Sequence, residues 1–375
     1  MIYLDYSANT PVDARVLEQF CAVERRCIGN ANSHHQAGSA AKEEIDAATI
    51  KIASLLGVQP AEIIYTSGAS EANNFALKGL ARLSRHAGRH IISTPLEHSS
   101  VSGTLTALQE QGYEIDLLDV KQDGTVDLEH LKDLLRPDTI CVAVTLVDSE
   151  LGVVQPVQEI AAILKAYPHC HLHVDATQAV GKIPVSFEGV DTMSLTAHKF
   201  YGLNGIGLLI KRRNLALEPL IHGGESTTIY RSGTPTVALA SSLACALDLA
   251  VTDLPGRVDH VAKLNAELRA ALSTYPLVRI NSPDHAIPHV LNLSVRNVKG
   301  TVFQRELDAK GVCISVKSAC SSDGLPSRAV FAVSRDRRNA LSSWRISLSH
   351  LTTEDEIKAF LQAFDVCYRE LTAVH

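Results

Sequence analysis

The sequence lacks any Cys-x-x-Cys pair, although it contains eight cysteines among its 375 residues. Paired cysteines at that spacing bind zinc or iron–sulfur clusters, so neither a zinc knuckle nor an iron–sulfur site is expected, and no metal is predicted. The cysteines lie at positions 21, 27, 141, 170, 245, 313, 320 and 367. In a reducing compartment most of them should be small core residues, and Cys320 is the one whose surroundings differ.

Three further absences limit the location and the partners. The N-terminus has no basic segment followed by an apolar one, and no run reaches the roughly 18–20 apolar residues of a transmembrane helix. The net charge is −6, so no general positive field attracts nucleic acid or an anionic membrane. We therefore predict a cytoplasmic protein that binds neither.

Short β-rich runs alternate with helical periods between residues 60 and 211. Strands are expected at 62–67, 90–95, 113–120, 139–147, 171–176 and 205–211, and helices at 70–85, 101–111 and 156–167. This alternation predicts an α/β fold with a mostly parallel sheet covered by helices on both faces.

The pattern changes after residue 255. One long helix is expected at 257–275, short strands at 289–295, 312–316 and 344–349, and a last helix at 353–370. These elements indicate a smaller α+β domain. We predict a large domain over residues 15–257 and a small domain formed by residues 1–14 and 258–375.

Two motifs place polar residues at strand ends. In "YTSGASEANN", residues 65–74, a strand ends, Gly68 allows a tight turn and Ser70 can cap a helix whose free N–H groups favour phosphate. In "HVDATQAVGK", residues 173–182, Asp175 follows an apolar strand and could hold a protonated heteroaromatic nitrogen, with Gln178 nearby. The alternative is that Asp175 caps the next helix.

A third motif, "LTAHKFYGLNG" at residues 195–205, contains Lys199. A partly buried lysine can form a Schiff base with a carbonyl compound, whereas most lysines are simply exposed. A phosphate loop, a strand-end Asp175 and Lys199 together match the phosphate, ring nitrogen and aldehyde of pyridoxal 5'-phosphate (PLP), which we predict as the cofactor.

Ten collinear segments carry a resemblance to a known family over essentially the whole chain. They are "YLDYSANTPVD", "GNANSHHQAG", "TSGASEANN", "EHSSV", "ELGVVQP", "VDATQAVGK", "LTAHKFYGLNGIG", "RSGT", "SACSS" and "WRISLS". The chain resembles the cysteine desulfurases of the NifS/IscS type, within the class-V aminotransferases of fold type I. The resemblance implies a large PLP-binding domain and a smaller domain that carries the catalytic cysteine.

The resemblance also implies roles for the cofactor site. Lys199 would bond covalently to PLP, Asp175 would pair with the ring nitrogen and Gln178 with the ring hydroxyl. His98 would stack on the ring and transfer protons. The remaining implied cofactor ligands are Gly68, Ala69, Ser70, Ser149, Thr196, His198 and Thr234. Thr234 would reach the cofactor of a second protomer, which implies a homodimer.

The implied substrate is L-cysteine. Arg345 would hold its carboxylate bidentately, and His35 corresponds to a histidine on the active-site side. A free thiol has a pKa of about 8.5, so a modest shift makes Cys320 a useful nucleophile at neutral pH. Cys320 would take the sulfur as a persulfide, leave L-alanine, and pass the sulfur to an acceptor protein by thiol exchange.

Two of the departures from the family pattern bear on the cofactor site and its rim. Asp148 and Ser149 stand where an asparagine pair is usual, which changes how the ring hydroxyl would be held. Glu225, in "HGGESTTIY" at residues 222–230, replaces a glycine, and glycine adopts backbone angles that glutamate avoids. The shape of the active-site rim is therefore open at this stage.

Several alternatives remain open from the sequence. The same fold serves selenocysteine lyases and β-eliminating C–S lyases, and the two departures are compatible with a degenerate, non-catalytic partner in a sulfur-transfer assembly. The acceptor is not identified, because iron–sulfur cluster assembly, tRNA thiolation and DNA phosphorothioation all use such enzymes. Trp344 is expected in the core.

Overall fold

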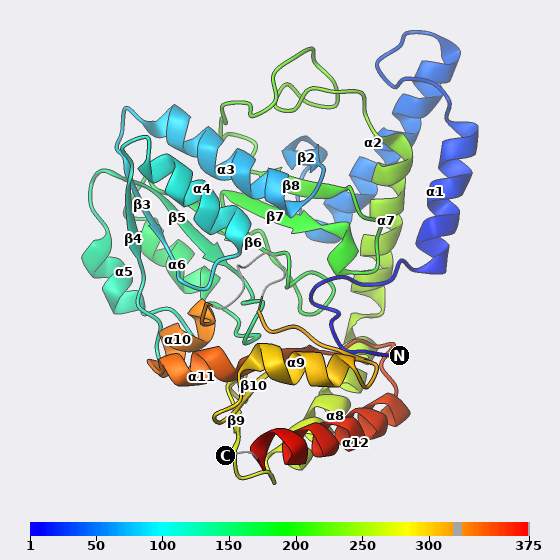
Figure 1. Cartoon of the computed structure of the whole chain (residues 1–375). Coiled ribbons are helices and arrows are strands. Elements are labelled where there is room, and N and C mark those ends of the chain that lie inside the picture. The colour runs from blue at the N-terminus through cyan, green and yellow to red at the C-terminus, as the bar shows by residue number, and fades with distance from the viewer. Residues whose placement is uncertain (318–324, 374–375) are drawn as a thin grey trace.

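The computed structural model describes residues 1–317 and 325–373 (Figure 1). Its main sheet has seven strands in the order β2-β8-β7-β6-β5-β3-β4. They are β2 (Ile63–Thr66), β3 (His90–Ser93), β4 (Glu114–Leu117), β5 (Thr139–Thr145), β6 (His171–Asp175), β7 (Thr192–Thr196) and β8 (Gly207–Lys211). The strands from β4 to β7 pair in parallel. The predicted α/β fold with a mostly parallel sheet is confirmed.

Two features of this sheet were not predicted. β7 was missed because its sequence, "TMSLT", alternates over only five residues and leads directly into the Lys199 turn. β8 runs antiparallel to both β7 and β2. The reason is the short connection over residues 197–206, since a parallel return needs a crossover of about a dozen residues or more.

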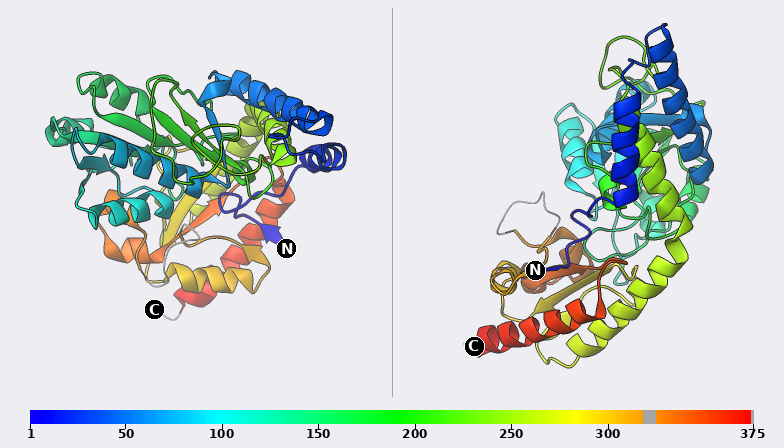
Figure 2. Two further views of the ribbon diagram at one scale, coloured as in Figure 1. Left: turned by 90° about the horizontal axis from the view of Figure 1, so that it is seen from above. Right: turned by 90° about the vertical axis from the view of Figure 1, so that its right-hand side faces the viewer.

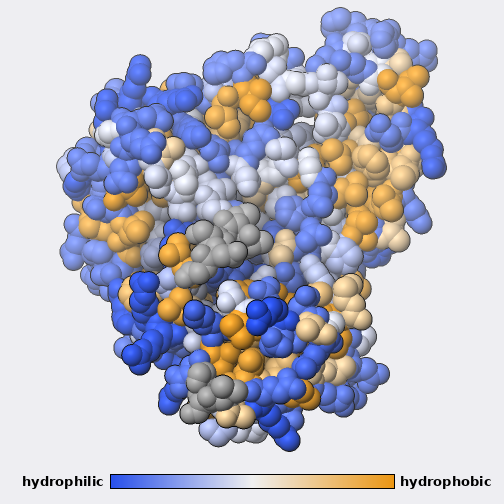
Figure 3. All heavy atoms as spheres, viewed as in Figure 1, coloured by the Kyte–Doolittle hydropathy of each residue, from blue (hydrophilic) through white to orange (hydrophobic). Residues whose placement is uncertain are grey.

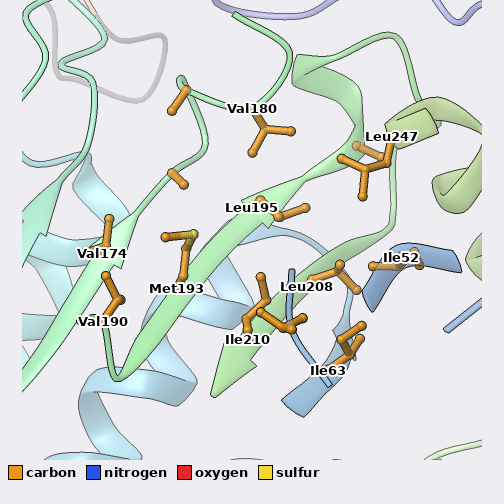
Figure 4. Close-up of a cluster of buried hydrophobic side chains, with 14 of the residues drawn as sticks. Ile52, Ile63, Val174, Val180, Val190, Met193, Leu195, Leu208, Ile210 and Leu247 are labelled. Carbon is orange, nitrogen blue, oxygen red and sulfur yellow. The ribbon is translucent and has the colours of Figure 1, made fainter. Parts of the chain in front are cut away.

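Helices cover both faces of the sheet, as expected. α3 (Ala69–Ser84) and α4 (Ser99–Gln109) bury Phe75 and Leu105 against one face. The other face is covered by α2 (Gln36–Leu56), α5 (Leu128–Leu134), α6 (Val157–Leu164) and α7 (Val237–Thr252), and α1 (Ala14–Arg26) packs on α7. Figure 4 shows Met193, Leu195 and Leu208 of the sheet in one apolar cluster with Leu247 of α7.

Strand alternation separates apolar from polar side chains in the middle of the sheet. Met193 and Leu195 of β7 belong to the core beneath α7, and so does Val174 of β6. Successive strand residues point to opposite faces, so the residues between them face α3. That face therefore receives a buried polar row, which is formed by His173 and Asp175 of β6 and Thr192, Ser194 and Thr196 of β7.

A second sheet, in the order β12-β10-β9, is antiparallel and has its own core. Its strands are β9 (Val278–Ile280), β10 (Val290–Val295) and β12 (Ser343–Ser347), and its helices are α8 (Leu254–Leu272), α9 (Gly300–Asp308) and α12 (Glu354–Thr372). Trp344 is fully buried there and stacks on Phe303, which confirms its predicted core position. Side views show this unit at one end of the molecule and the large sheet at the other (Figure 2).

The N-terminal segment joins the two sheets. β1 (Ile2–Tyr3) pairs in parallel with β11 (Val312–Cys313), which is shorter than the predicted strand at 312–316. Leu4 is buried in the core of the second sheet. The remaining short elements are η1 (Pro60–Glu62), η2 (Ala197–Lys199), α10 (Arg328–Ser334) and α11 (Arg337–Ser342). The exact limits of the two domains stay a prediction.

The cysteines are less buried than expected. Cys141, Cys170 and Cys367 are buried, whereas the other four described cysteines are half-buried. Cys320 lies outside the described residues.

No individual helix within residues 1–317 and 325–373 combines the length and the apolar composition that crossing a bilayer requires. α7 and α8 satisfy these limits only when taken together, and they are bent by 64° relative to each other.

Candidate active site

A cavity of about 320 Å³ opens at the carboxyl ends of β5, β6 and β7, beside the start of α3. This is the edge at which open α/β sheets bind ligands. Eleven of the residues predicted for the site line it, namely Gly68, Ala69, Ser70, His98, Ser149, Asp175, Gln178, Thr196, His198, Lys199 and Arg345. Segments more than 270 residues apart in the sequence thus meet at one cavity.

Lys199 ends η2, directly after β7, and its ammonium group lies in the cavity wall. Nζ donates to the carbonyl oxygens of Ser7 at 2.8 Å and Ala8 at 2.6 Å. The N-terminal segment therefore orients the side chain. The alternative that Lys199 is an ordinary surface lysine is wrong.

Asp175 is 3% exposed at the end of β6. Its Oδ2 accepts a hydrogen bond from Nδ2 of Asn73 at 2.8 Å, and its Oδ1 accepts one from the backbone N–H of Thr177 at 2.9 Å. The second bond resembles the capping alternative, although a turn follows here rather than a helix. Each carboxylate oxygen keeps a lone pair, so Asp175 can also accept from a ligand in the cavity.

Gln178 is held at both ends of its amide. Nε2 donates to the carbonyl of Ser7 at 2.9 Å, and Oε1 accepts from Nζ of Lys182 at 2.7 Å. Lys182 is itself buried, and desolvation, with smaller contributions from Lys199 and Arg345, lowers its pKa to about 7. This arrangement leaves the second N–H of Gln178 as a donor for the cavity.

The start of α3 differs from the prediction in one detail. The N-cap is Gly68, with φ 154°, and not Ser70, which lies in the first turn. This φ favours glycine at position 68, and the close approach of β8 requires glycine at position 207, where a Cβ would lie 2.7 Å from Cα of Gly68. The first N–H groups of a helix have no intrahelical partner, so this bare helix start can bind an anion.

Thr196 and His198 lie opposite that helix start. Oγ1 of Thr196 is 3.1 Å from Nδ1 of His198, and a Cβ on Gly68 would lie 3.4 Å from the same oxygen. Burial, together with the charges of Lys199 and Lys182, lowers the pKa of His198 to about 4. His198 is therefore neutral near pH 7 and can hydrogen-bond to an anion without adding charge.

His98 precedes α4 as its N-cap. Nδ1 accepts the backbone N–H of Ser100 at 3.1 Å and lies 2.8 Å from the hydroxyl of the same serine. Burial lowers the pKa of His98, against the opposing effect of Asp175.

Arg345 lies in β12 and reaches the cavity from the second sheet. Nη2 is 2.9 Å from Oδ1 of Asp5, and Nη1 donates to the carbonyl of Ser149 at 2.7 Å. Ser149 thus lines the cavity and also holds Arg345 through its backbone carbonyl. The neighbouring Asp148 is buried, and desolvation raises its pKa to about 7.

Two predicted site residues, Thr234 and His35, are not among the described residues that line the cavity. Thr234 is exposed in the loop at residues 222–236. His35 is exposed and caps α2, where Nδ1 accepts the N–H of Gly38 at 3.2 Å. Cys320 lies outside the described residues. The roles of these three stay predictions.

Glu225, the second departure from the family pattern, does not strain the backbone. The described residues with positive φ other than glycine are Tyr201, Asn297 and Arg335. Glutamate at this position is therefore compatible with the loop.

The structure adds residues to which the sequence analysis gave no role. Ser7 and Ala8 bind Lys199, Asn73 binds Asp175, Lys182 binds Gln178 and Asp5 binds Arg345. All five lie inside segments already singled out as motifs. Their roles could not be predicted from the motifs alone, because each residue binds a partner whose position is known only from the folded structure.

Comparison with known proteins identifies the family. A family model described as aminotransferase class-V matches residues 2–360. The chain belongs to the class-V aminotransferases. Among curated relatives, the cysteine desulfurase IscS of Proteus mirabilis is 40% identical over 365 residues, which is 95% of this chain and 90% of that protein. Full-length relatives of this kind place it with the NifS/IscS-type cysteine desulfurases of the class-V family.

Solved structures of the class-V family agree. A NifS-like protein superposes with a TM-score of 0.92 at 35% identity, covering 99% of both chains. A structure described as SspA in complex with cysteine gives a TM-score of 0.82 at 31% identity, covering 94% of this chain and 100% of the other.

Class-V aminotransferases depend on PLP, and the cavity suits that group. Lys199 can meet an aldehyde and Asp175 a protonated ring nitrogen. Gln178 presents a donor for a ring hydroxyl, and the α3 start with Thr196 and His198 can receive a phosphate. The donor set therefore fits each polar part of the cofactor.

Proposed function

We propose that this protein is a PLP-dependent cysteine desulfurase. The observation that carries the proposal is the convergence of Lys199, Asp175, Gln178, His98 and Arg345 on one cavity at the start of α3. When bound, PLP supplies an electron sink that stabilises negative charge at the substrate α-carbon. The residues supply binding, orientation and proton transfer.

The proposed reaction converts L-cysteine and one enzyme thiol into L-alanine and an enzyme persulfide. Arg345 binds the substrate carboxylate. Lys199 removes the α-proton of L-cysteine and later returns a proton to the same carbon. Asp175 would accept a hydrogen bond from the ring nitrogen of bound PLP and so favour the protonated form of that nitrogen. The Cys320 thiolate attacks the substrate sulfur, the C–S bond breaks, and a proton replaces sulfur on the β-carbon.

A homodimer is part of this proposal. Thr234 is exposed, outside the cavity of its own chain, in a loop that Arg231 ties to Glu71 of α3 at 3.0 Å. Figure 3 shows apolar residues gathered over α1 and α7. Leu17 of α1 is 43% exposed and Val251 of α7 is 41% exposed. A second copy on this face would cover them and bring its own Thr234 towards the cofactor phosphate.

The location and the sulfur acceptor are separate predictions. We expect a cytoplasmic enzyme that transfers sulfur to an acceptor protein, with iron–sulfur assembly, tRNA thiolation and DNA phosphorothioation as candidate pathways. Mixed disulfides trapped on Cys320 would identify the acceptor by mass spectrometry.

The experiment that tests the function measures products. The full chain, reconstituted with PLP, is given L-cysteine, and alanine, pyruvate, free sulfide and persulfide-bound Cys320 are quantified. Alanine with a stoichiometric Cys320 persulfide is the expected result. Pyruvate with free sulfide would indicate a β-eliminating lyase, and a chain that binds no PLP would indicate a non-catalytic partner.

The selenocysteine lyase alternative needs its own comparison. L-cysteine and L-selenocysteine are each given to the wild type and to Cys320→Ala. A desulfurase should turn over L-cysteine, and this turnover should require Cys320. A chain that acts on selenocysteine alone would contradict the proposal.

A further inference from the structure

Behind Asp175 lies a buried polar network that the proposed reaction does not use. It occupies the α3 face of the sheet, where strand alternation places the polar residues of β6 and β7. Asn73, in the second turn of α3, is 0% exposed and forms its centre. A buried amide is costly unless its hydrogen-bonding groups are satisfied.

Asn73 uses both sides of its amide. Nδ2 donates to Oδ2 of Asp175 at 2.8 Å and to Oγ of Ser100 at 2.9 Å. Oδ1 lies 3.0 Å from Nε2 of His173 and accepts the hydroxyl of Ser194. These four contacts satisfy both N–H donors and both lone pairs of the oxygen.

The amide has one favourable orientation. An ionised carboxylate only accepts hydrogen bonds, so Nδ2 must face Asp175, and the reverse orientation would oppose two oxygens. Oδ1 then requires a donor from His173, which must carry hydrogen on Nε2. Nδ1 of His173 is left to accept the hydroxyl of Thr192 at 2.9 Å.

The second N–H of Asn73 determines the direction of the next bond. Because Oγ of Ser100 accepts from Asn73, its own hydrogen can point to Nδ1 of His98, 2.8 Å away. The backbone N–H of Ser100 approaches the same nitrogen at 3.1 Å. A ring nitrogen that receives two donors cannot carry hydrogen, so neutral His98 carries its hydrogen on Nε2.

We propose that Asn73 is a positioning residue that fixes two groups of the active site together: the carboxylate of Asp175 and the Nε2–H tautomer of His98. The importance of these two groups for catalysis rests on the proposed function. The inferred tautomer of His98 does not depend on that function. In this arrangement neutral His98 offers a proton to the cavity, and α-proton removal is left to Lys199.

The tautomer is measured on the full chain without cofactor, with ring nitrogens of histidine labelled with ¹⁵N, near pH 8. The His98 signal is assigned by its loss in His98→Gln. We expect an unprotonated Nδ1 and a protonated Nε2. Hydrogen on Nδ1 would overturn the inference, whether or not the protein turns over L-cysteine.

Two neighbouring asparagines provide a matched pair of variants. Asn73→Ala should raise the dissociation constant for PLP at least tenfold and give a mixture of His98 tautomers. Asn74→Ala should change the constant less than twofold, because within the described chain the side-chain hydrogen bonds of Asn74 go to the backbone carbonyls of Ser70 and Ser100. Equal effects of the two variants on PLP binding would contradict a special role for Asn73.

A milder variant keeps the inference testable if Asn73→Ala does not fold. Ser100→Ala removes the half-buried hydroxyl of Ser100 in the first turn of α4. The backbone N–H of the same residue stays in place. The Nδ1-protonated tautomer of His98 should then become detectable while PLP affinity stays within threefold. A tautomer unchanged from the wild type would overturn the link through Ser100.

Discussion

The guanidinium of Arg345 lies against the carboxylate of Asp5, with Nη2 2.9 Å from Oδ1, although the two residues are 340 positions apart. Ser315 donates to the other carboxylate oxygen of Asp5 at 2.8 Å and holds it in place. Arg345 is 2% exposed, and its Nε has no hydrogen-bond partner within the described part of the chain. Asp5 thus orients the guanidinium, and the second N–H of each of Nη1 and Nη2 is left for a substrate carboxylate.

Asp5→Asn should therefore weaken substrate binding more than chemistry. The amide keeps one acceptor but loses the charge, and a charge-assisted bond to a buried arginine is worth about 1.5–3 kcal/mol. We expect KM for L-cysteine to rise about tenfold or more, since about 1.4 kcal/mol corresponds to a factor of ten, with kcat changed less than threefold. Steady-state alanine production measures both constants.

Asp13 provides the control for this prediction, because it also pairs with an arginine, Arg15, at 2.8 Å, but does so on the surface. Asp13→Asn should leave KM unchanged. An unchanged KM in Asp5→Asn would mean that Arg345 keeps its orientation without Asp5.

Lys199→Ala should abolish both turnover and the visible absorbance band of the lysine-bound cofactor. No other described lysine lines the cavity of about 320 Å³, so no second amine is placed to replace it. Absorbance spectra of the reconstituted protein measure the effect. Lys211→Ala, at a buried lysine on β8 that donates to nearby carbonyls, should keep the band. Retention of the band in Lys199→Ala would contradict the assignment.

Cys320→Ala should keep the absorbance band but stop persulfide formation, because it removes the thiolate and leaves the cofactor ligands intact. Thiol alkylation followed by mass spectrometry measures the persulfide. Cys313, seven positions earlier on β11, is the matched control, and Cys313→Ala should transfer sulfur normally. Persulfide formation at the wild-type level in Cys320→Ala would assign the sulfur to another cysteine.

The sequence predicted the parts of the site that one motif carries. Asp175 follows an apolar strand that was predicted, and it does reach the carboxyl edge of the sheet. Lys199 reaches the same edge at the end of β7, a strand that was not predicted. This succeeds because parallel strands end at a common edge, so a local pattern is enough to place a residue there.

The sequence could not predict contacts that depend on tertiary packing. Asp5 reaches Arg345 because β1 pairs with β11 beside β12, and Asn73 reaches Asp175 because α3 packs on β6. Helices α1, α2, α5 and α7 were also missed. α7 is apolar around most of its surface because α1 and α2 cover it, so it lacks the amphipathic period that marks an exposed helix.

Lys182→Met should disturb the cofactor site without removing any direct ligand. Methionine keeps the buried volume but cannot donate to Oε1 of Gln178. The amide is then held only by the bond from Nε2 to the carbonyl of Ser7 and is less firmly oriented towards the ring hydroxyl. We expect the dissociation constant for PLP to rise about fivefold, consistent with the loss of about 1 kcal/mol from one hydrogen bond. Lys211→Met, at a buried lysine outside the cavity, should leave the constant unchanged. Equal constants for Lys182→Met and the wild type would contradict the positioning role.

Glu97→Gln should change the pH dependence of stability. Glu97 is 4% exposed; Oε1 accepts hydrogen bonds from Thr94 and Thr145, while Oε2 has no partner within the described chain. Burial raises its pKa from 4.5 to about 8. Between these values the folded state keeps a proton that the unfolded state has lost, so the free energy of unfolding falls as pH rises.

Glutamine cannot titrate, so in Glu97→Gln the free energy of unfolding no longer contains the decrease with pH that Glu97 causes. Over two pH units inside the window, from about pH 5.5 to about 7.5, one proton corresponds to about 2.7 kcal/mol. Urea unfolding at the two pH values should show that the variant gains about this much relative to the wild type as pH rises, whatever the substitution costs at either pH. Glu110→Gln, at an exposed glutamate after α4, should show no such gain. A constant difference between Glu97→Gln and the wild type would mean that Glu97 is ionised in the folded protein, with a water or cation on Oε2.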